Sequence, residues 1–217
     1  MNSVKIMIDG NSVHAKEGMT ILEAAQQNGI DIPTLCYSKN FAASGNCRIC
    51  VVEVDGFRSL VGSCHTPIVD GMVIHTRSAK VEKARNVTVQ LLMAAHTGQC
   101  VSDSHTGGCE LRKLADRLQV GEPMFRMRKR RWYPNEDSNP YVKREMSKCI
   151  LCRKCVDACR EVAKKNVYSI AERGFGSKII VDCDVPLVSE ACKGCDICID
   201  CCPTGALSKA RTMGDMT

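Results

Sequence analysis

Aromatic residues are scarce in this sequence, with only four Phe, four Tyr and one Trp among 217 residues. Domains smaller than about 70–80 residues with so few large apolar side chains usually need disulfides or metals for stability. The chain has sixteen cysteines. We therefore expect bonds made by the cysteine side chains, either as disulfides or to metals, to stabilise much of the structure.

Secretory and membrane signals are also missing. The opening residues, MNSVKIMIDGNSVHAKEG, lack the cationic and apolar regions of a signal peptide. No apolar run approaches the length of a membrane span. In the reducing cytoplasm, closely spaced cysteines bind metals more often than they form disulfides. The sequence thus predicts a cytoplasmic, metal-binding protein with no direct membrane span.

Nucleotide-binding and hydrolytic motifs are missing as well. No G-x-G-x-x-G follows a strand, and neither a P-loop nor an H-E-x-x-H motif occurs. The chain ends fifteen residues after Cys202, which leaves no room for a hydrogenase or molybdopterin active-site domain. We expect no catalytic site in this chain.

The first seventy-odd residues predict a small α+β domain of the β-grasp type. Residues 4–9 and 12–18 read as a hairpin, and Thr20 begins a helix that Gly29 ends. Later signals predict strands within residues 48–54, 57–64 and 72–76, and helices over residues 80–95 and 109–119. Residues 122–148 read as an extended connection.

An internal repeat organises the last third of the chain. CILCRKCVDAC and CKGCDICIDCC share the spacing C-x2-C-x2-C-x3-C at an offset of 43 residues, which is the bacterial ferredoxin signature for [4Fe–4S] clusters. In two-cluster ferredoxins the fourth cysteine of each run serves the other cluster. One cluster is therefore assigned to Cys149, Cys152, Cys155 and Cys202, and its mate to Cys192, Cys195, Cys198 and Cys159. Zinc is the alternative, but zinc sites typically pair two separate C-x2-C knuckles.

Four more cysteines lie inside the expected β-grasp domain: Cys36, Cys47, Cys50 and Cys64. Plant-type [2Fe–2S] sites share the C-x2-C and the distant fourth ligand, although the first loop is longer here. Gly45 and Asn46 precede Cys47, and we expect them to let backbone amides turn toward sulfur. Zinc or unligated thiols are the alternatives.

Three groups of residues give the chain a family resemblance. IPTLCY, GNCRICVVEV and GSCHTP, then EDSNPYVKREMSKCILCRKCVDAC, and finally CCPTGAL resemble the N-terminal part of the complex I large iron–sulfur subunit. The same layout occurs in the diaphorase subunit of soluble NAD-reducing hydrogenases and in the accessory region of iron-only hydrogenases. The resemblance implies three domains: a β-grasp [2Fe–2S] domain at 1–78, a small helical His/Cys-ligated cluster domain at 79–120, and a basic connection with a two-[4Fe–4S] ferredoxin-like domain at 121–217.

The family's middle motif, H-x3-C-x2-C-x5-C, has a departure in this chain. His96, Cys100 and Cys109 occupy its first, second and fourth positions, and Asp103 stands at the third. Carboxylate is a harder ligand than thiolate, so we expect a variant [4Fe–4S] or [3Fe–4S] cluster at this site. His105 could replace the missing ligand, and a degenerate loop without a cluster is the alternative.

The resemblance also implies partners. We expect an electron relay between a flavin-containing NAD(P)H-binding subunit and a second redox subunit, such as a hydrogenase, a formate dehydrogenase or another nucleotide-binding subunit. An electron-bifurcating complex is one version of this assembly. A free-standing multi-cluster ferredoxin is the first alternative.

A zinc-stabilised nucleic-acid-binding protein is the remote alternative. Residues 122–148 carry eight Lys or Arg against four Asp or Glu, but only Trp132 and Tyr133 could stack on bases. We therefore expect no nucleic-acid partner. Cys183 and Cys201 remain outside the ligand sets and read as small buried hydrophobes.

Overall fold

The computed structural model describes residues 3–96, 108–121, 124–125, 139–181 and 190–210. Contacts divide the chain into two compact units, and each is described here by itself. Unit 1 contains residues 1–37 and 43–90, and unit 2 contains residues 38–42 and 91–217. None of the helices in the described ranges is long and apolar enough to cross a membrane.

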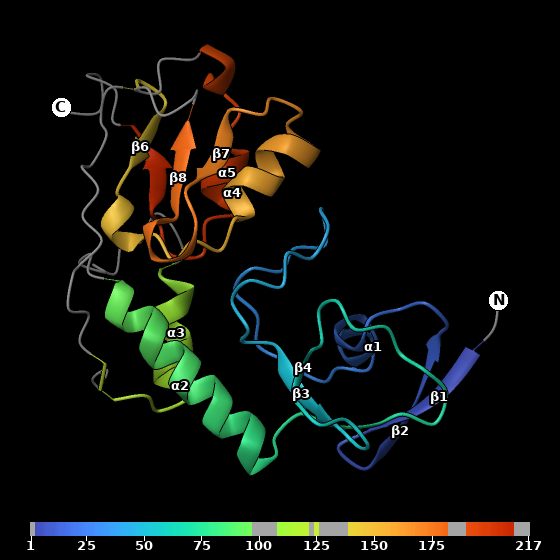
Figure 1. Ribbon diagram of the computed structural model, residues 1–217. Helices are drawn as coiled ribbons and strands as arrows, with labels where there is room; N and C mark the ends of the chain where they lie inside the picture. Colours follow the sequence, from blue (N-terminus) through green and yellow to red (C-terminus); the bar gives the residue numbers. More distant parts are fainter. Residues whose placement is uncertain (1–2, 97–107, 122–123, 126–138, 182–189, 211–217) are drawn as a thin grey trace. The chain divides into compact units, whose positions relative to one another are not determined.

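Unit 1 is built on a five-stranded mixed sheet (Figure 1). Its strands are β1 (Ser3–Ile8), β2 (Asn11–Lys16), β3 (Val51–Val54), β4 (Val61–Gly62) and β5 (Val73–His75). They lie in the order β2-β1-β5-β3-β4, with β1 and β5 parallel and the other neighbours antiparallel. This α+β arrangement around a parallel central pair is the expected β-grasp fold.

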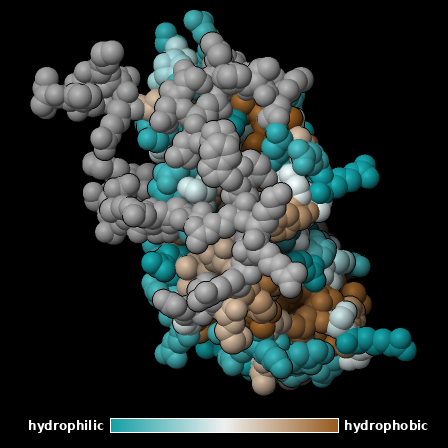
Figure 2. Space-filling model, turned by 60° about the vertical axis from the view of Figure 1, so that its left-hand side comes forward, coloured by the Kyte–Doolittle hydropathy of each residue, from teal (hydrophilic) through white to brown (hydrophobic). Residues whose placement is uncertain are grey.

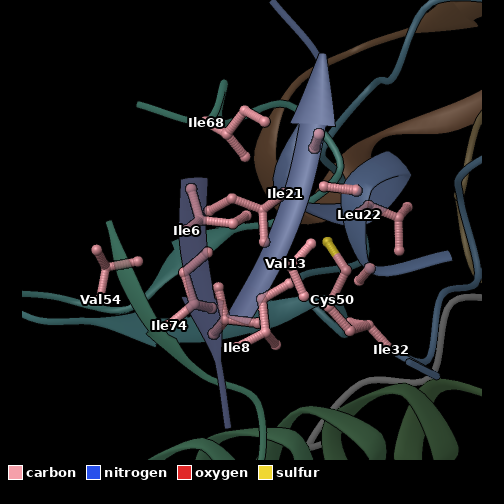
Figure 3. Close-up of a cluster of buried hydrophobic side chains, with 14 of the residues drawn as sticks. Ile6, Ile8, Val13, Ile21, Leu22, Ile32, Cys50, Val54, Ile68 and Ile74 are labelled. Atoms are coloured by element: carbon pink, nitrogen blue, oxygen red, sulfur yellow. The ribbon is translucent and has the colours of Figure 1, made fainter. Parts of the chain in front are cut away.

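Helix α1 (Ile21–Gln27) begins at the capping box that Thr20 forms with Glu23. The Thr20 hydroxyl accepts the backbone N–H of Glu23, whose carboxylate accepts that of Thr20, so two donors of the first turn are satisfied. Apolar side chains of the helix and strands then close one core (Figure 3). The sulfur-bearing side chain of Cys50 is part of this core, which fixes the cysteine loop to the sheet.

Two helices confirm the next sequence predictions. Helix α2 (Ala79–Ala95) runs for 17 residues and ends directly before His96. Helix α3 (Glu110–Arg117) begins immediately after its N-cap residue, Cys109. It buries Leu111, Leu114 and Ala115 on one side, which is the amphipathic spacing expected for a surface helix.

Unit 2 contains two small antiparallel sheets (Figure 1). Strand β6 (Val142–Arg144) pairs with β9 (Leu207–Lys209), and β7 (Tyr168–Ala171) pairs with β8 (Lys178–Val181). The expectation of an extended connection over residues 122–148 was therefore incomplete. Its last part forms β6 and the 3₁₀ helix η1 (Met146–Lys148), because pairing with a distant strand supplied the backbone hydrogen bonds.

The two halves of the cysteine repeat adopt matching backbone conformations. Short helices α4 (Lys154–Asp157) and α5 (Ile197–Asp200) follow left-handed residues, Arg153 with φ 70° and Asp196 with φ 47°. A π-helical turn, η2 (Ala158–Val162), continues α4. The unit's core combines apolar side chains with six cysteines of the repeat that are buried or packed against it: Cys149, Cys155, Cys159, Cys192, Cys198 and Cys202.

Other short elements complete unit 2. The 3₁₀ helix η3 (Gly174–Gly176) lies between β7 and β8, and η4 (Glu190–Cys192) reaches the first cysteine of the second run. Among the coloured residues of Figure 2, hydrophilic side chains alternate with groups of hydrophobic ones that reach the surface. Phe57 and Phe175 are among the exposed large apolar side chains.

Candidate iron–sulfur centres

The four cysteines of unit 1 form two hydrogen-bonded pairs. Cys36 pairs with Cys47, and Cys50 pairs with Cys64. The hydrogen bond from the Cys47 thiol lowers the pKa of Cys36 to about 5, and the one from the Cys64 thiol lowers the pKa of Cys50 to about 6. The partner thiols have raised pKa values because each gives its hydrogen bond to a thiolate and is buried.

Backbone geometry around Cys36 follows the sequence expectation for Gly45 and Asn46. Gly45 has φ 64°, a left-handed conformation that glycine adopts without strain. The backbone N–H of Cys47 donates to Cys36 Sγ over 3.5 Å, and a backbone hydrogen bond from Asn46 also lowers the pKa of Cys36. Such N–H groups stabilise negative charge on sulfur.

Two further residues near these cysteines were not identified from the sequence. The imidazole of His65 places Nδ1 3.5 Å from Cys64 Sγ and lies so close to Gly62 that a Cβ there would be 2.3 Å from its Cε1. From α2, the buried Arg85 donates to the carbonyls of Ile49 and Val51 over 3.1 and 2.8 Å. His65 could have been singled out from its place directly after Cys64 in GSCHTP, whereas no local pattern marks Arg85, whose contacts are made only in the folded chain.

The repeat of unit 2 surrounds two cavities. One is lined by Cys149, Cys152, Cys155 and Cys202, together with Arg144, Arg153 and apolar side chains; we call it cavity A. The other is lined by Cys159, Cys192, Cys195 and Cys198, together with Lys165 and Asp196; we call it cavity B. Cysteines far apart in the chain, such as Cys155 and Cys202, therefore line one cavity. Tyr168 lines both cavities.

Burial and hydrogen bonding set the properties of these thiols. Burial raises the pKa of Cys152 and Cys155, and it raises the pKa of Cys198 to about 12. Backbone N–H groups point at two other sulfurs, from Leu151 to Cys149 over 3.4 Å and from Val167 to Cys159 over 3.3 Å. A metal that displaces the thiol protons would bind sulfurs already shielded from water.

Donor chemistry supports a polynuclear centre in these cavities. Each is lined by four thiols, the ligands that iron–sulfur clusters use. Within the described residues, no group of three or more His, Cys, Asp or Glu converges on the position of a single ion. Among the described lining residues of cavities A and B, Cys201 does not occur. The sequence predicted that Cys201 is buried, but its side chain is half-buried, and its thiol donates to the Cys198 carbonyl over 3.5 Å. Cys183 lies outside the described residues.

The middle motif is only partly described. His96 Nε2 lies 3.7 Å from Cys109 Sγ, and His96 Nδ1 lies 2.9 Å from the Lys148 carbonyl oxygen. The carbonyl fixes the proton on Nδ1 and leaves the Nε2 lone pair directed toward Cys109. The structure therefore brings two of the four expected ligands together. Cys100, Asp103 and His105 lie outside the described residues.

Comparisons with known proteins identify both units. Residues 1–79 match the 2Fe-2S iron-sulfur cluster binding domain, and residues 139–208 match the ferredoxin-like domain of NADH-quinone oxidoreductase subunit 3. The chain therefore contains a 2Fe-2S cluster binding domain and a ferredoxin-like domain of the type found in NADH-quinone oxidoreductase subunit 3. This result, together with the sheet topology, confirms the resemblance to complex I and hydrogenase iron–sulfur subunits and the α+β fold class.

The curated relatives that the chain matches are much longer proteins. The chain is 40% identical over 212 residues to the NADP-reducing hydrogenase subunit HndD of Solidesulfovibrio fructosivorans, covering 95% of this chain and 36% of the relative. It is 33% identical to the mitochondrial NADH-ubiquinone oxidoreductase 78 kDa subunit of Candida albicans, covering 94% and 28%. The NADPH-Fe(3+) oxidoreductase subunit alpha of Geobacter sulfurreducens is 32% identical, with coverage of 94% and 24%. The chain thus spans only a minor part of the length of these relatives.

A solved structure of similar length also matches. One chain in the crystal structure of an NAD+-reducing [NiFe]-hydrogenase in the H2-reduced state superposes with a TM-score of 0.83 and 26% identity. The match covers 100% of this chain and 91% of that chain. The same fold therefore occurs both inside longer chains and as a chain of nearly this length.

Proposed function

We propose that this chain carries a series of iron–sulfur clusters and relays electrons between two redox partners. The observation that carries the proposal is the sorting of the repeat's eight cysteines into two cavities of four, each combining three cysteines of one run with one of the other. That is the ligand pattern of two-cluster ferredoxins. Each cavity would hold one [4Fe–4S] cluster.

The [2Fe–2S] cluster would lie in unit 1. The two thiol pairs support a ligand set in which Cys36 and Cys47 hold one iron and Cys50 and Cys64 hold the other. The Cys36 and Cys50 thiols have lowered pKa values, so a metal displaces fewer protons there. The chain's own contribution is to bury these sulfurs and to direct backbone N–H groups at them.

A fourth cluster would be bound by His96, Cys100 and Cys109. The remaining ligand would be either the Asp103 carboxylate or a water molecule on one iron. The His96–Cys109 approach supports this site, because Nε2 faces the sulfur while Nδ1 is held by a carbonyl. Three ligands can hold three corners of a cubane, so a [3Fe–4S] or a labile [4Fe–4S] cluster fits the sequence.

The partners would be a flavin-containing NAD(P)H-binding subunit and a second redox subunit. The names of the relatives support this, since they are subunits of an NADP-reducing hydrogenase and of quinone or iron oxidoreductases that use NADH or NADPH. The match to a chain of an NAD+-reducing [NiFe]-hydrogenase favours a relay within a multi-subunit complex over a free-standing ferredoxin. The second partner would be a hydrogenase, a formate dehydrogenase or another nucleotide-binding subunit.

Metal analysis tests the cluster content. Anaerobically purified protein should contain the iron and acid-labile sulfide of one two-iron and two four-iron clusters at least, with a variable further amount from the fourth site. Zinc with negligible sulfide would overturn the proposal and favour the zinc-protein alternative.

A second experiment tests the relay. Chain purified from its native host should bring a flavoprotein with it, and NAD(P)H should reduce the clusters only when that flavoprotein is present. Direct reduction of a monomeric chain by a diffusing partner, with no stable complex, would favour a free-standing ferredoxin.

A further inference from the structure

The two halves of the cysteine repeat have opposite charges at one equivalent position. The offset of 43 residues places Arg153 in the first run where Asp196 stands in the second. Their backbones match, with φ 70° and φ 47°, and so do the residues two positions earlier, Leu151 with φ 55° and Gly194 with φ 64°. The same loop geometry therefore presents a cation in one half and an anion in the other.

The side chains of Arg153 and Asp196 line different cavities. Arg153 lines cavity A, and Asp196 lines cavity B. Nε of Arg153 is buried and has no hydrogen-bond partner among the described residues. Asp196 pairs with Lys209 over 2.5 Å, but the Lys209 side chain is 70% exposed, so water screens that cation.

A second arginine adds to the difference in charge between the two cavities. Arg144, from β6, also lines cavity A, and its Nε and Nη1 atoms are buried. Among the described residues that line cavity B, the one cation is Lys165, which is exposed and donates to the Ala191 carbonyl. Two half-buried arginines with buried guanidinium nitrogens thus line cavity A, while an anion and an exposed lysine line cavity B.

Charge near a cluster changes its reduction potential. Four thiolates make a [4Fe–4S] centre anionic, and reduction adds one more negative charge. A neighbouring cation stabilises the reduced form more than the oxidised form, and burial strengthens that interaction because water screens it less. Net charge is one of the factors that set cluster potentials.

We propose that the cluster in cavity A has the higher potential of the two, and that Arg153 and Asp196 set this order with support from Arg144. A single electron shared by the pair then resides mainly in cavity A. Since Tyr168 lines both cavities, the two centres are neighbours, and the potential difference gives electron flow between them a direction. This inference rests on the proposed function, which places a four-iron cluster in each cavity.

The experiment is a reductive titration of the anaerobic full-length chain, followed by electron paramagnetic resonance. Parallel titrations of Cys149→Ser and Cys195→Ser assign the two four-iron signals to their cavities. In the wild type, the cavity A signal should appear first. Arg153→Gln should move the electron partition about tenfold toward cavity B, equivalent to about 59 mV for a one-electron couple.

Matched variants distinguish the effect of charge on the potentials from a structural effect of the substitution. Arg153→Lys keeps the charge and should keep the wild-type order. Asp196→Asn should raise the cavity B potential by a smaller amount, because the Asp196 side chain is itself 30% exposed and water screens its charge. Arg160→Gln removes an exposed arginine, whose side chain pairs with Asp157 and Glu161, and should leave both potentials unchanged. Arg144→Gln should act in the same direction as Arg153→Gln.

Three results would overturn the inference: reduction of cavity B first in the wild type, equal shifts of both signals in Arg153→Gln, or the same shift in Arg160→Gln. If Arg153→Gln does not load its clusters, the wild-type order and Asp196→Asn still decide the question. Iron and sulfide counts distinguish failure of the proposed function, because two four-iron clusters with unchanged potentials contradict only the inference.

Discussion

His96 Nδ1 lies 2.9 Å from the carbonyl oxygen of Lys148, the residue directly before Cys149. One hydrogen bond thus joins the histidine of the middle motif to the start of the ferredoxin-like repeat, 52 residues later. It fixes the ring so that Nε2 faces Cys109 Sγ. Partners of this kind orient ligating histidines and tune their basicity.

His96→Ala should remove the cluster of the middle site and leave the other three. The imidazole supplies one ligand, and its loss also breaks the hydrogen bond to Lys148. We expect the iron count to fall by three or four, as measured by iron and sulfide analysis. The matched control is His75→Ala, since His75 is a partly exposed histidine bonded to Asp55. Equal iron in His96→Ala and the wild type would show that His96 holds no cluster.

Asp103→Cys should restore the usual one-histidine, three-cysteine ligand set. Thiolate binds iron–sulfur clusters more strongly than carboxylate does, so the fourth iron should resist mild oxidation that converts the wild-type site to a three-iron species. Spectra and iron counts of wild type, Asp103→Cys and Cys100→Ala make the comparison. If wild type and Cys100→Ala are identical while Asp103→Cys gains four irons, the native loop is empty.

Cys202→Ser should damage the cluster of cavity A far more than Cys201→Ser does. Cys202 lines that cavity with Cys149, Cys152 and Cys155, whereas the Cys201 thiol donates to the Cys198 carbonyl. The four-iron signal and the iron content report the difference. Similar losses in both variants would contradict the assignment of Cys202 as the ligand.

Arg85→Met should destabilise unit 1 by about 3 kcal/mol, because it leaves the buried carbonyls of Ile49 and Val51 without a charged donor. For a domain of this size, that corresponds to a drop of more than about 10 °C in the midpoint of [2Fe–2S] bleaching. Thermal melts of the full chain measure it. Arg77→Met, at an exposed position, is the control and should change stability by less than about 0.5 kcal/mol.

Local sequence signals determined the elements of unit 1. The β1–β2 hairpin turns at Asp9 and Gly10, with φ 50° and 82°, one residue earlier than the Gly10-Asn11 pair that the sequence suggested, and Thr20 with Glu23 begins α1. Each signal acts between neighbours in the chain, so it can be read without the fold. The cluster motifs of the repeat could likewise be predicted from the cysteine spacing, because three cysteines at fixed intervals in one tight loop direct their thiols toward one centre.

Only the tertiary structure decided which distant side chains act on these centres. Arg85 reaches the Ile49 carbonyl across 36 residues, His96 meets Lys148 across 52, and β6 pairs with the distant strand β9. That pairing makes Arg144 line cavity A together with Arg153, whereas the repeat alone showed only that Arg153 and Asp196 occupy equivalent positions. Burial in the folded chain gives these charges their effect, and no local pattern encodes burial between residues so far apart.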